Sequence, residues 1–93
     1  MIRSFRDKGT ECLFSRRYSQ RFPPDVQRTA WRKLAMLDAA ENLNDLRAPP
    51  GNRLEELKGD LDGYHSIRVN EQWRIVFRWD GGDAHEVRLV DYH

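Results

Sequence analysis

The chain has 93 residues, a formal net charge of +1 and a single cysteine, Cys12. One cysteine excludes an internal disulfide, so the core must come from packing alone. The sequence has no run of about 18 apolar residues, which is the length that a membrane-spanning helix needs. We therefore expect a single domain over residues 1–93, in the reducing cytoplasm and without a membrane partner.

The charges are unevenly distributed along the chain. Residues 1–33 carry nine Lys and Arg against three Asp and Glu, residues 34–62 carry three against seven, and residues 63–93 carry four against five. The basic first third could bind phosphates or an acidic partner protein. The overall balance is too mild for a protein that holds free nucleic acid by charge alone.

The first half of the sequence predicts a short strand and two helices. Ile2 and Phe5 suggest the strand, and apolar residues follow helical spacing from Thr10 onward. A second helix should begin in the Pro-Pro-Asp run at 23–25, because proline fits a first turn and aspartate suits its positive end. This helix should continue to about Ala40.

The second half predicts strands joined by turns. Residues 48–52 read Ala-Pro-Pro-Gly-Asn, which interrupts regular structure, and apolar residues then alternate with polar ones through residues 66–70 and 73–79. The run Asp-Gly-Gly-Asp at 80–83 is typical of a hairpin turn, and a last strand should run from Ala84 to about Tyr92. Two helices followed by an antiparallel meander predict an α+β domain with helices on one sheet face.

Arginines are expected on the other face of this sheet. If the apolar residues of strand 73–79 face the helices, Arg74 and Arg78 project the opposite way, and Arg68 can share their face. An ordinary polar outer face is the alternative interpretation.

The run Asp91-Tyr92-His93 follows directly on the apolar alternation of the last strand. A strand holds side chains at its tip in place, and these three side chains can position, donate and accept protons. The alternative is a solvated polar tail.

Four segments together resemble the HigB-type toxins of the RelE superfamily, which belong to type II toxin–antitoxin systems. The segments are Leu57–Asp60, Gly63–Asn70, Trp73–Phe77 and Val90–His93. The similarity extends over nearly the whole chain. It implies a single RelE-like toxin domain, in which two N-terminal helices pack on a small, curved, mainly antiparallel sheet.

The resemblance also implies an activity and partners. Such a toxin would be a metal-independent endoribonuclease that cuts messenger RNA in the ribosomal decoding site and so inhibits translation. Its partners would be the ribosome, messenger RNA and a HigA-like helix-turn-helix antitoxin, with operator DNA bound only through the antitoxin. No cofactor is expected, and three scattered histidines and one cysteine show no metal-ligand spacing. The alternative is a catalytically weak or inert module that binds the ribosome or the antitoxin.

The site that the resemblance implies has two groups of residues. The catalytic group is Asp91, Tyr92 and His93 with Glu55, and the phosphate-binding group is Lys58, Arg74 and Arg68. Glu55 stands where many HigB relatives carry histidine, so it can act as a base but cannot supply a cation. In this the chain looks most like the GraT branch, whose toxicity is comparatively weak.

Overall fold

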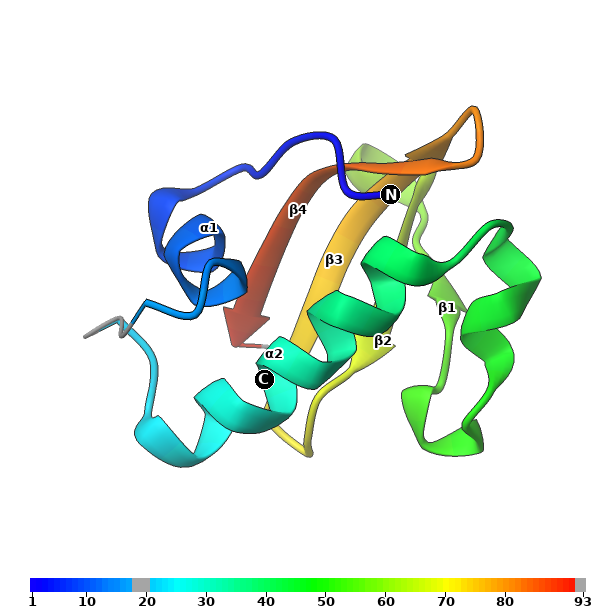
Figure 1. The fold of residues 1–93 in the computed structure, drawn as a ribbon. Helices are drawn as coiled ribbons and strands as arrows, with labels where there is room; N and C mark the ends of the chain where they lie inside the picture. The colour runs from blue at the N-terminus through cyan, green and yellow to red at the C-terminus, as the bar shows by residue number, and fades with distance from the viewer. Residues whose placement is uncertain (18–20, 92–93) are drawn as a thin grey trace.

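The computed structural model describes residues 1–17 and 21–91 of the chain. Two helices lie on one side of a twisted antiparallel sheet (Figure 1). The helices are α1 (Lys8–Phe14) and α2 (Pro24–Ala39), and the strands are β1 (Glu55–Glu56), β2 (Tyr64–Arg68), β3 (Trp73–Asp80) and β4 (Asp83–Asp91). The predicted α+β class is confirmed. Within the described ranges, no helix has both the length and the apolar character needed to cross a membrane.

The first helix begins earlier than the apolar spacing predicted. The side chain of Asp7 accepts a hydrogen bond of 2.6 Å from the backbone N–H of Thr10, and this cap starts α1 at Lys8. The helix ends at Phe14, and Arg16 then adopts a left-handed backbone conformation with φ of 62°. Ile2 and Phe5 form two isolated parallel bridges to β4 in place of the regular strand that was expected.

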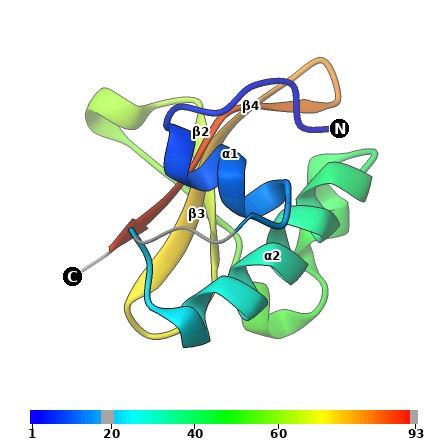
Figure 2. The ribbon, with the colours of Figure 1, turned by 60° about the vertical axis from the view of Figure 1, so that its left-hand side comes forward.

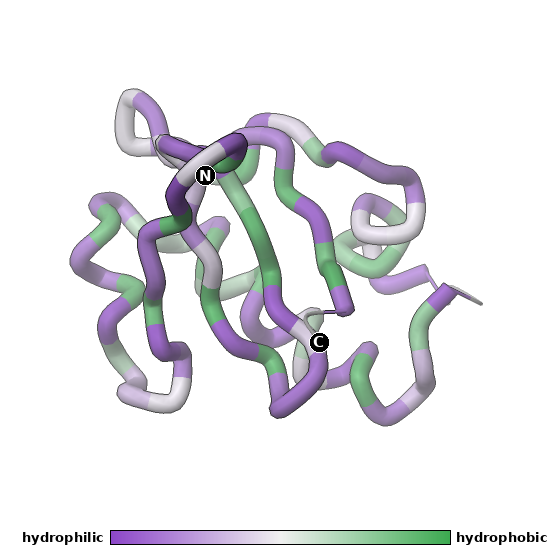
Figure 3. The backbone as a smooth tube through the Cα atoms, turned by 180° about the vertical axis from the view of Figure 1, so that it is seen from behind, coloured by the Kyte–Doolittle hydropathy of each residue, from purple (hydrophilic) through white to green (hydrophobic). Residues whose placement is uncertain are grey.

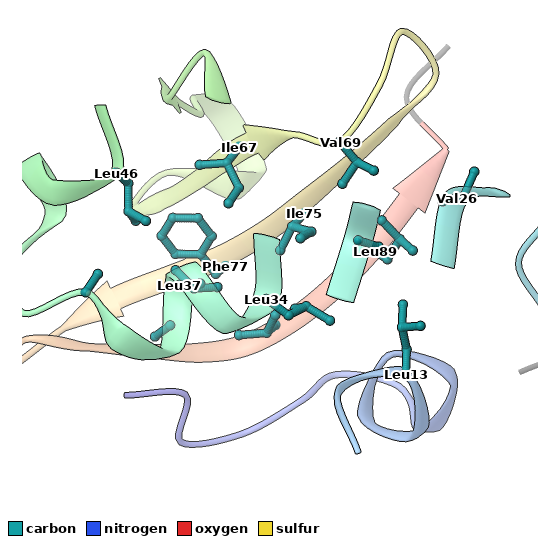
Figure 4. Packing of buried hydrophobic residues seen from close by; sticks show 14 of the residues in the cluster. Leu13, Val26, Leu34, Leu37, Leu46, Ile67, Val69, Ile75, Phe77 and Leu89 are labelled. Atoms are coloured by element: carbon teal, nitrogen blue, oxygen red, sulfur yellow. The ribbon is translucent and has the colours of Figure 1, made fainter. Parts of the chain in front are cut away.

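The second helix runs as predicted and supplies much of the core. Its buried residues are Val26, Ala30, Leu34 and Leu37. The last two point toward Ile75 and Phe77 of β3 (Figure 4), which are fully buried. Burying one such side chain contributes roughly 1.5–3 kcal/mol to folding, so this layer accounts for the placement of α2 on the sheet.

The sheet has strand order β1-β2-β3-β4, with every neighbouring pair antiparallel. Viewed from the side away from the helices, apolar and polar residues alternate along the strands (Figure 3). Gly81 and Gly82, with φ of 61° and 81°, make the hairpin turn that the sequence predicted. A β-bulge interrupts the β3–β4 register between Val76 and Arg78, and Glu86 beside it has φ of 53°.

The segment between α2 and β1 is tied down by one buried side chain. Asn52 is fully buried, and its Nδ2 donates to the backbone oxygens of Leu46 at 3.1 Å and Ala48 at 3.3 Å. The Lys33 ammonium of α2 donates to Asn52 Oδ1. The next residue, Arg53, has a left-handed conformation with φ of 43°. These contacts fix the position of Arg53, two residues before β1, which is the edge strand of the sheet next to β2.

Candidate functional site

A hollow of about 410 Å³ opens beside β2 and β3. It is lined by Arg53, Glu55, Arg68, Asn70, Glu71 and Arg74. Arg68 and Arg74 are directly paired across the two strands, and their neighbours Ile67 and Ile75 are paired and buried under the helices. Because successive residues of a strand point to opposite faces, the hollow lies on the face that the helices leave uncovered. Three of the residues proposed for the site, Arg68, Arg74 and Glu55, thus line one hollow.

Arg74 is the buried arginine among the three that line the hollow. It is only 7% exposed, and its Nε donates to Ser66 Oγ at 2.9 Å. Its Nη2 donates to the backbone oxygen of Arg53 at 2.6 Å and to that of Ser66 at 3.4 Å. A buried charge is costly unless it is hydrogen-bonded, so these acceptors both stabilise the guanidinium and hold its orientation.

Glu55 lies at the rim of the same hollow. Its Oε1 is 3.7 Å from Arg74 Nη2, and its side chain is 53% exposed. At this distance and exposure the ion pair contributes little to stability. The carboxylate is therefore accessible to a bound molecule while it remains next to a cation, which is an arrangement suited to accepting a proton near a phosphate.

Positive charge extends from the hollow toward α2. Burial first, and the charge of Arg68 second, lower the pKa of the Lys33 ammonium below its usual range. Three arginines and two glutamates line the hollow itself. The hollow therefore has a positive excess that suits a phosphate, with carboxylates at its edge.

The remaining predicted site residues lie elsewhere or outside the described ranges. Lys58 is exposed just before the short 3-10 helix at residues 59–61, and it does not line the hollow. Asp91 ends β4 opposite Trp73, and its Oδ2 accepts a hydrogen bond of 2.9 Å from Gln72 Nε2. Tyr92 and His93 fall outside the described residues, so their predicted place in the site stays a prediction.

Sequence reasoning missed three contributors to this face. Ser66 and the backbone oxygen of Arg53 hold Arg74, and nothing in their residue types signals that task. Arg88 of β4 pairs with Val76 on the same face, and its Nε is buried without a hydrogen-bond partner among the described residues. The alternation of Arg88 with two apolar neighbours would have identified its face.

A second polar cluster lies further along the uncovered face. Glu86 Oε2 accepts hydrogen bonds from the Tyr64 hydroxyl at 2.9 Å and from Arg78 Nε at 3.3 Å. The Tyr64 hydrogen bond, followed by that of Arg78, lowers the pKa of the Glu86 carboxyl.

In residues 1–17 and 21–91, no group of three or more His, Cys, Asp or Glu side chains is arranged to hold a metal ion.

Two solved structures share the fold of this chain. The chain superposes on a toxin–antitoxin structure described as the YoeB–YefM complex from Staphylococcus aureus with a TM-score of 0.62 at 20% identity, covering 100% of this chain and 98% of that one. A mutant of YafQ from E. coli matches with a TM-score of 0.61 at 14% identity, over 98% of this chain and 93% of that one. These likenesses confirm the predicted architecture.

The sequence comparisons identify the family of this chain. A family model described as the RelE-like toxin of type II toxin–antitoxin system HigB matches residues 3–93. Toxin HigB-1 of Vibrio cholerae is 45% identical over 85 residues, covering 90% of each chain, and Endoribonuclease HigB of Proteus vulgaris is 39% identical over 94 residues, covering 100% of each. The chain belongs to the HigB-like toxin family, as the resemblance predicted.

Proposed function

We propose that this toxin is a metal-independent endoribonuclease that cuts messenger RNA in the ribosomal decoding site. The observation that carries the proposal is the hollow in which the buried, hydrogen-bonded Arg74 lies 3.7 Å from the Glu55 carboxylate. A phosphate-binding cation beside a proton acceptor is what RNA cleavage requires. The name of the Proteus vulgaris relative, Endoribonuclease HigB, supports the same reaction class.

In the proposed reaction the ribose 2′-oxygen attacks the adjacent phosphorus. The bond from phosphorus to the 5′-oxygen breaks, a base takes the 2′-hydroxyl proton, and an acid gives a proton to the leaving 5′-oxygen. Glu55 is our candidate base in the hollow, and His93 is the candidate acid, since an unperturbed imidazole titrates near neutrality. Arg74 and Arg68 hold the phosphate as its charge grows, because guanidinium offers a planar pair of donors.

The other predicted site residues take supporting parts in this proposal. Asp91 would orient the His93 ring or hold charge near it, and Tyr92 would stack on a base or donate a hydrogen bond. Lys58 would approach the RNA backbone from outside the hollow, which accords with its exposure.

We also propose the ribosome and an antitoxin as partners. With a net charge of +1 the toxin should hold free RNA poorly, so the ribosome would supply much of the substrate positioning. The antitoxin would be a HigA-like helix-turn-helix protein, and operator DNA would be bound only through it. A solved structure of the same fold, the heterotetrameric YoeB–YefM toxin–antitoxin complex from Staphylococcus aureus, supports an antitoxin as a partner.

A second candidate function is an inert module that binds ribosome or antitoxin. The observation that favours it is the ion pair itself, because Glu55 offsets part of the Arg74 charge that a phosphate would meet. A histidine at this position would not offset the Arg74 charge in this way.

Induction of the toxin followed by 5′-end mapping of cellular transcripts separates the two functions. The nuclease should produce new 5′ ends inside translated frames, and Arg74→Ala should remove them while the exposed control Arg47→Ala keeps them. Purified toxin should cut naked RNA poorly at physiological salt. An unchanged transcript map in arrested cells would favour the inert module, and efficient cleavage of naked RNA would contradict ribosome dependence.

A further inference from the structure

A cleft of about 600 Å³ lies between the end of α1 and the first half of α2. Figure 1 and Figure 2 together show both helices on the same side of the sheet. The cleft therefore lies on the helical side of the molecule, whereas the hollow of Arg74 faces the other way. Its lining includes four arginines and one tryptophan: Arg16, Arg17, Arg28, Arg32 and Trp31.

The side chains that line this cleft carry an excess of positive charge. None of the described residues that line it is acidic. Arg17, Arg28 and Arg32 are exposed, and within residues 1–17 and 21–91 their side chains form no ion pair or hydrogen bond. Like charges brought together in this way repel one another, so an anionic occupant would relieve that repulsion.

The bottom of the cleft is apolar and already organised. Leu13 is 3% exposed, and the Arg16 guanidinium carbon lies 3.9 Å from the centre of the Trp31 ring. The left-handed turn at Arg16, with φ of 62°, places this side chain against the indole. Trp31 Nε1 donates to the backbone oxygen of Phe14 at 3.2 Å, which ties α2 to the end of α1.

We propose that this cleft binds an acidic segment of the antitoxin, in which carboxylates alternate with apolar side chains. The carboxylates would meet the guanidinium groups, and the apolar side chains would pack against the indole edge of Trp31, which is partly exposed. This inference rests on the proposed antitoxin partner and assigns it a surface. That surface is separate from the hollow in which RNA is proposed to bind.

Two observations favour a protein segment over RNA. Proteins that bind single-stranded RNA commonly stack bases on aromatic rings, but one face of Trp31 is covered by Arg16 and its N–H is already bonded. In addition, residues 1–33 carry a local excess of positive charge within a chain of net charge +1. That pattern suits a locally acidic protein better than a long polyanion.

Fluorescence anisotropy on the full chain tests the proposal. One probe is a labelled peptide that alternates glutamate with leucine. The other is a labelled oligouridylate of equal net charge, which stands for RNA. Arg28→Glu with Arg32→Glu should weaken peptide binding by about tenfold, and added salt should weaken it in the wild type. Lys8→Glu with Arg47→Glu is the matched control, because both residues are exposed, lie outside the cleft and change the net charge equally.

The outcomes are distinct. The proposal is overturned if both double variants weaken the peptide equally, if the peptide binds independently of salt, or if only the oligouridylate responds to the cleft variant. Should the glutamate variant lose its melting transition, Arg28→Gln with Arg32→Gln must still weaken the peptide more than Lys8→Gln with Arg47→Gln. The cleft variant should still cleave RNA on ribosomes. If the wild-type toxin does not cleave RNA at all, the proposed nuclease activity is refuted, whereas the peptide-binding measurement still tests the cleft.

Discussion

Replacing Ser66 by alanine tests whether the buried arginine is held as the structure describes. Ser66 is fully buried, so no water can easily replace its Oγ as the acceptor for Arg74 Nε at 2.9 Å. A hydrogen bond to a charged group contributes about 1.5–3 kcal/mol, and two backbone oxygens continue to accept from Nη2. We therefore expect Ser66→Ala to lower the free energy of unfolding by about 1–3 kcal/mol.

A double-mutant cycle in urea isolates this interaction from other effects of the substitution. Ser66→Ala and Arg74→Met are measured alone and together, and a coupling energy of about 1 kcal/mol or more is expected. Ser15→Ala, at an exposed position, is the control and should change stability by less than about 0.5 kcal/mol. Strictly additive effects of the two core variants would refute the positioning of Arg74 by Ser66.

Three further predictions address the site and the fold. If Glu55 is the base, Glu55→Ala should reduce RNA cleavage and Glu55→His should leave it similar. A rise in cleavage by Glu55→His would instead show that histidine supplies a cation or an acid–base group that glutamate does not. Initial cleavage rates on ribosomes distinguish the two results. Deleting Tyr92 and His93 should abolish growth arrest at a stability cost of about 1 kcal/mol, and full toxicity with a normal melting curve would remove both from the site. The Tyr64 hydrogen bond lowers the pKa of Glu86 in the folded protein. The ionised carboxylate therefore stabilises the fold at any pH above the ordinary glutamate pKa of about 4.3. This contribution is lost as the pH falls through the lowered pKa of the folded state. On acidification below about pH 4, wild type should therefore lose more stability than Glu86→Gln, and parallel pH profiles would contradict that role.

The sequence predicted the long elements because their signals are long. The alternation through 73–79 and the Asp-Gly-Gly-Asp turn match β3 and the hairpin, and Pro24 begins α2 as expected. Strand β1 has only two residues, which is too short for any periodicity, and it exists because Glu55 and Glu56 pair with β2. The start of α1 was missed because Asp7, its cap, was not weighed against the apolar spacing.

The sequence could predict which face of the sheet the site residues on strands occupy, but not how their side chains are held. Alternation alone placed Arg68 and Arg74 on the uncovered face, and the structure pairs them directly. Alternation could not show that Arg74 is buried, because this depends on a backbone oxygen that the left-handed conformation of Arg53 presents to it. Residue types do not reveal backbone acceptors of this kind, so the hydrogen bonds that orient the buried Arg74 guanidinium emerge only in three dimensions.

Chemical analysis of the cleaved ends tests the central claim most directly. Purified toxin is added to ribosomes programmed with a defined messenger, and the new 5′ ends are assayed for hydroxyl or phosphate. Attack by the 2′-oxygen in the Arg74 hollow predicts 5′-hydroxyl fragments from the wild type and from Arg47→Ala, with a large loss in Arg74→Ala. Fragments with 5′-phosphate ends, or equal cleavage by Arg74→Ala, would contradict the account.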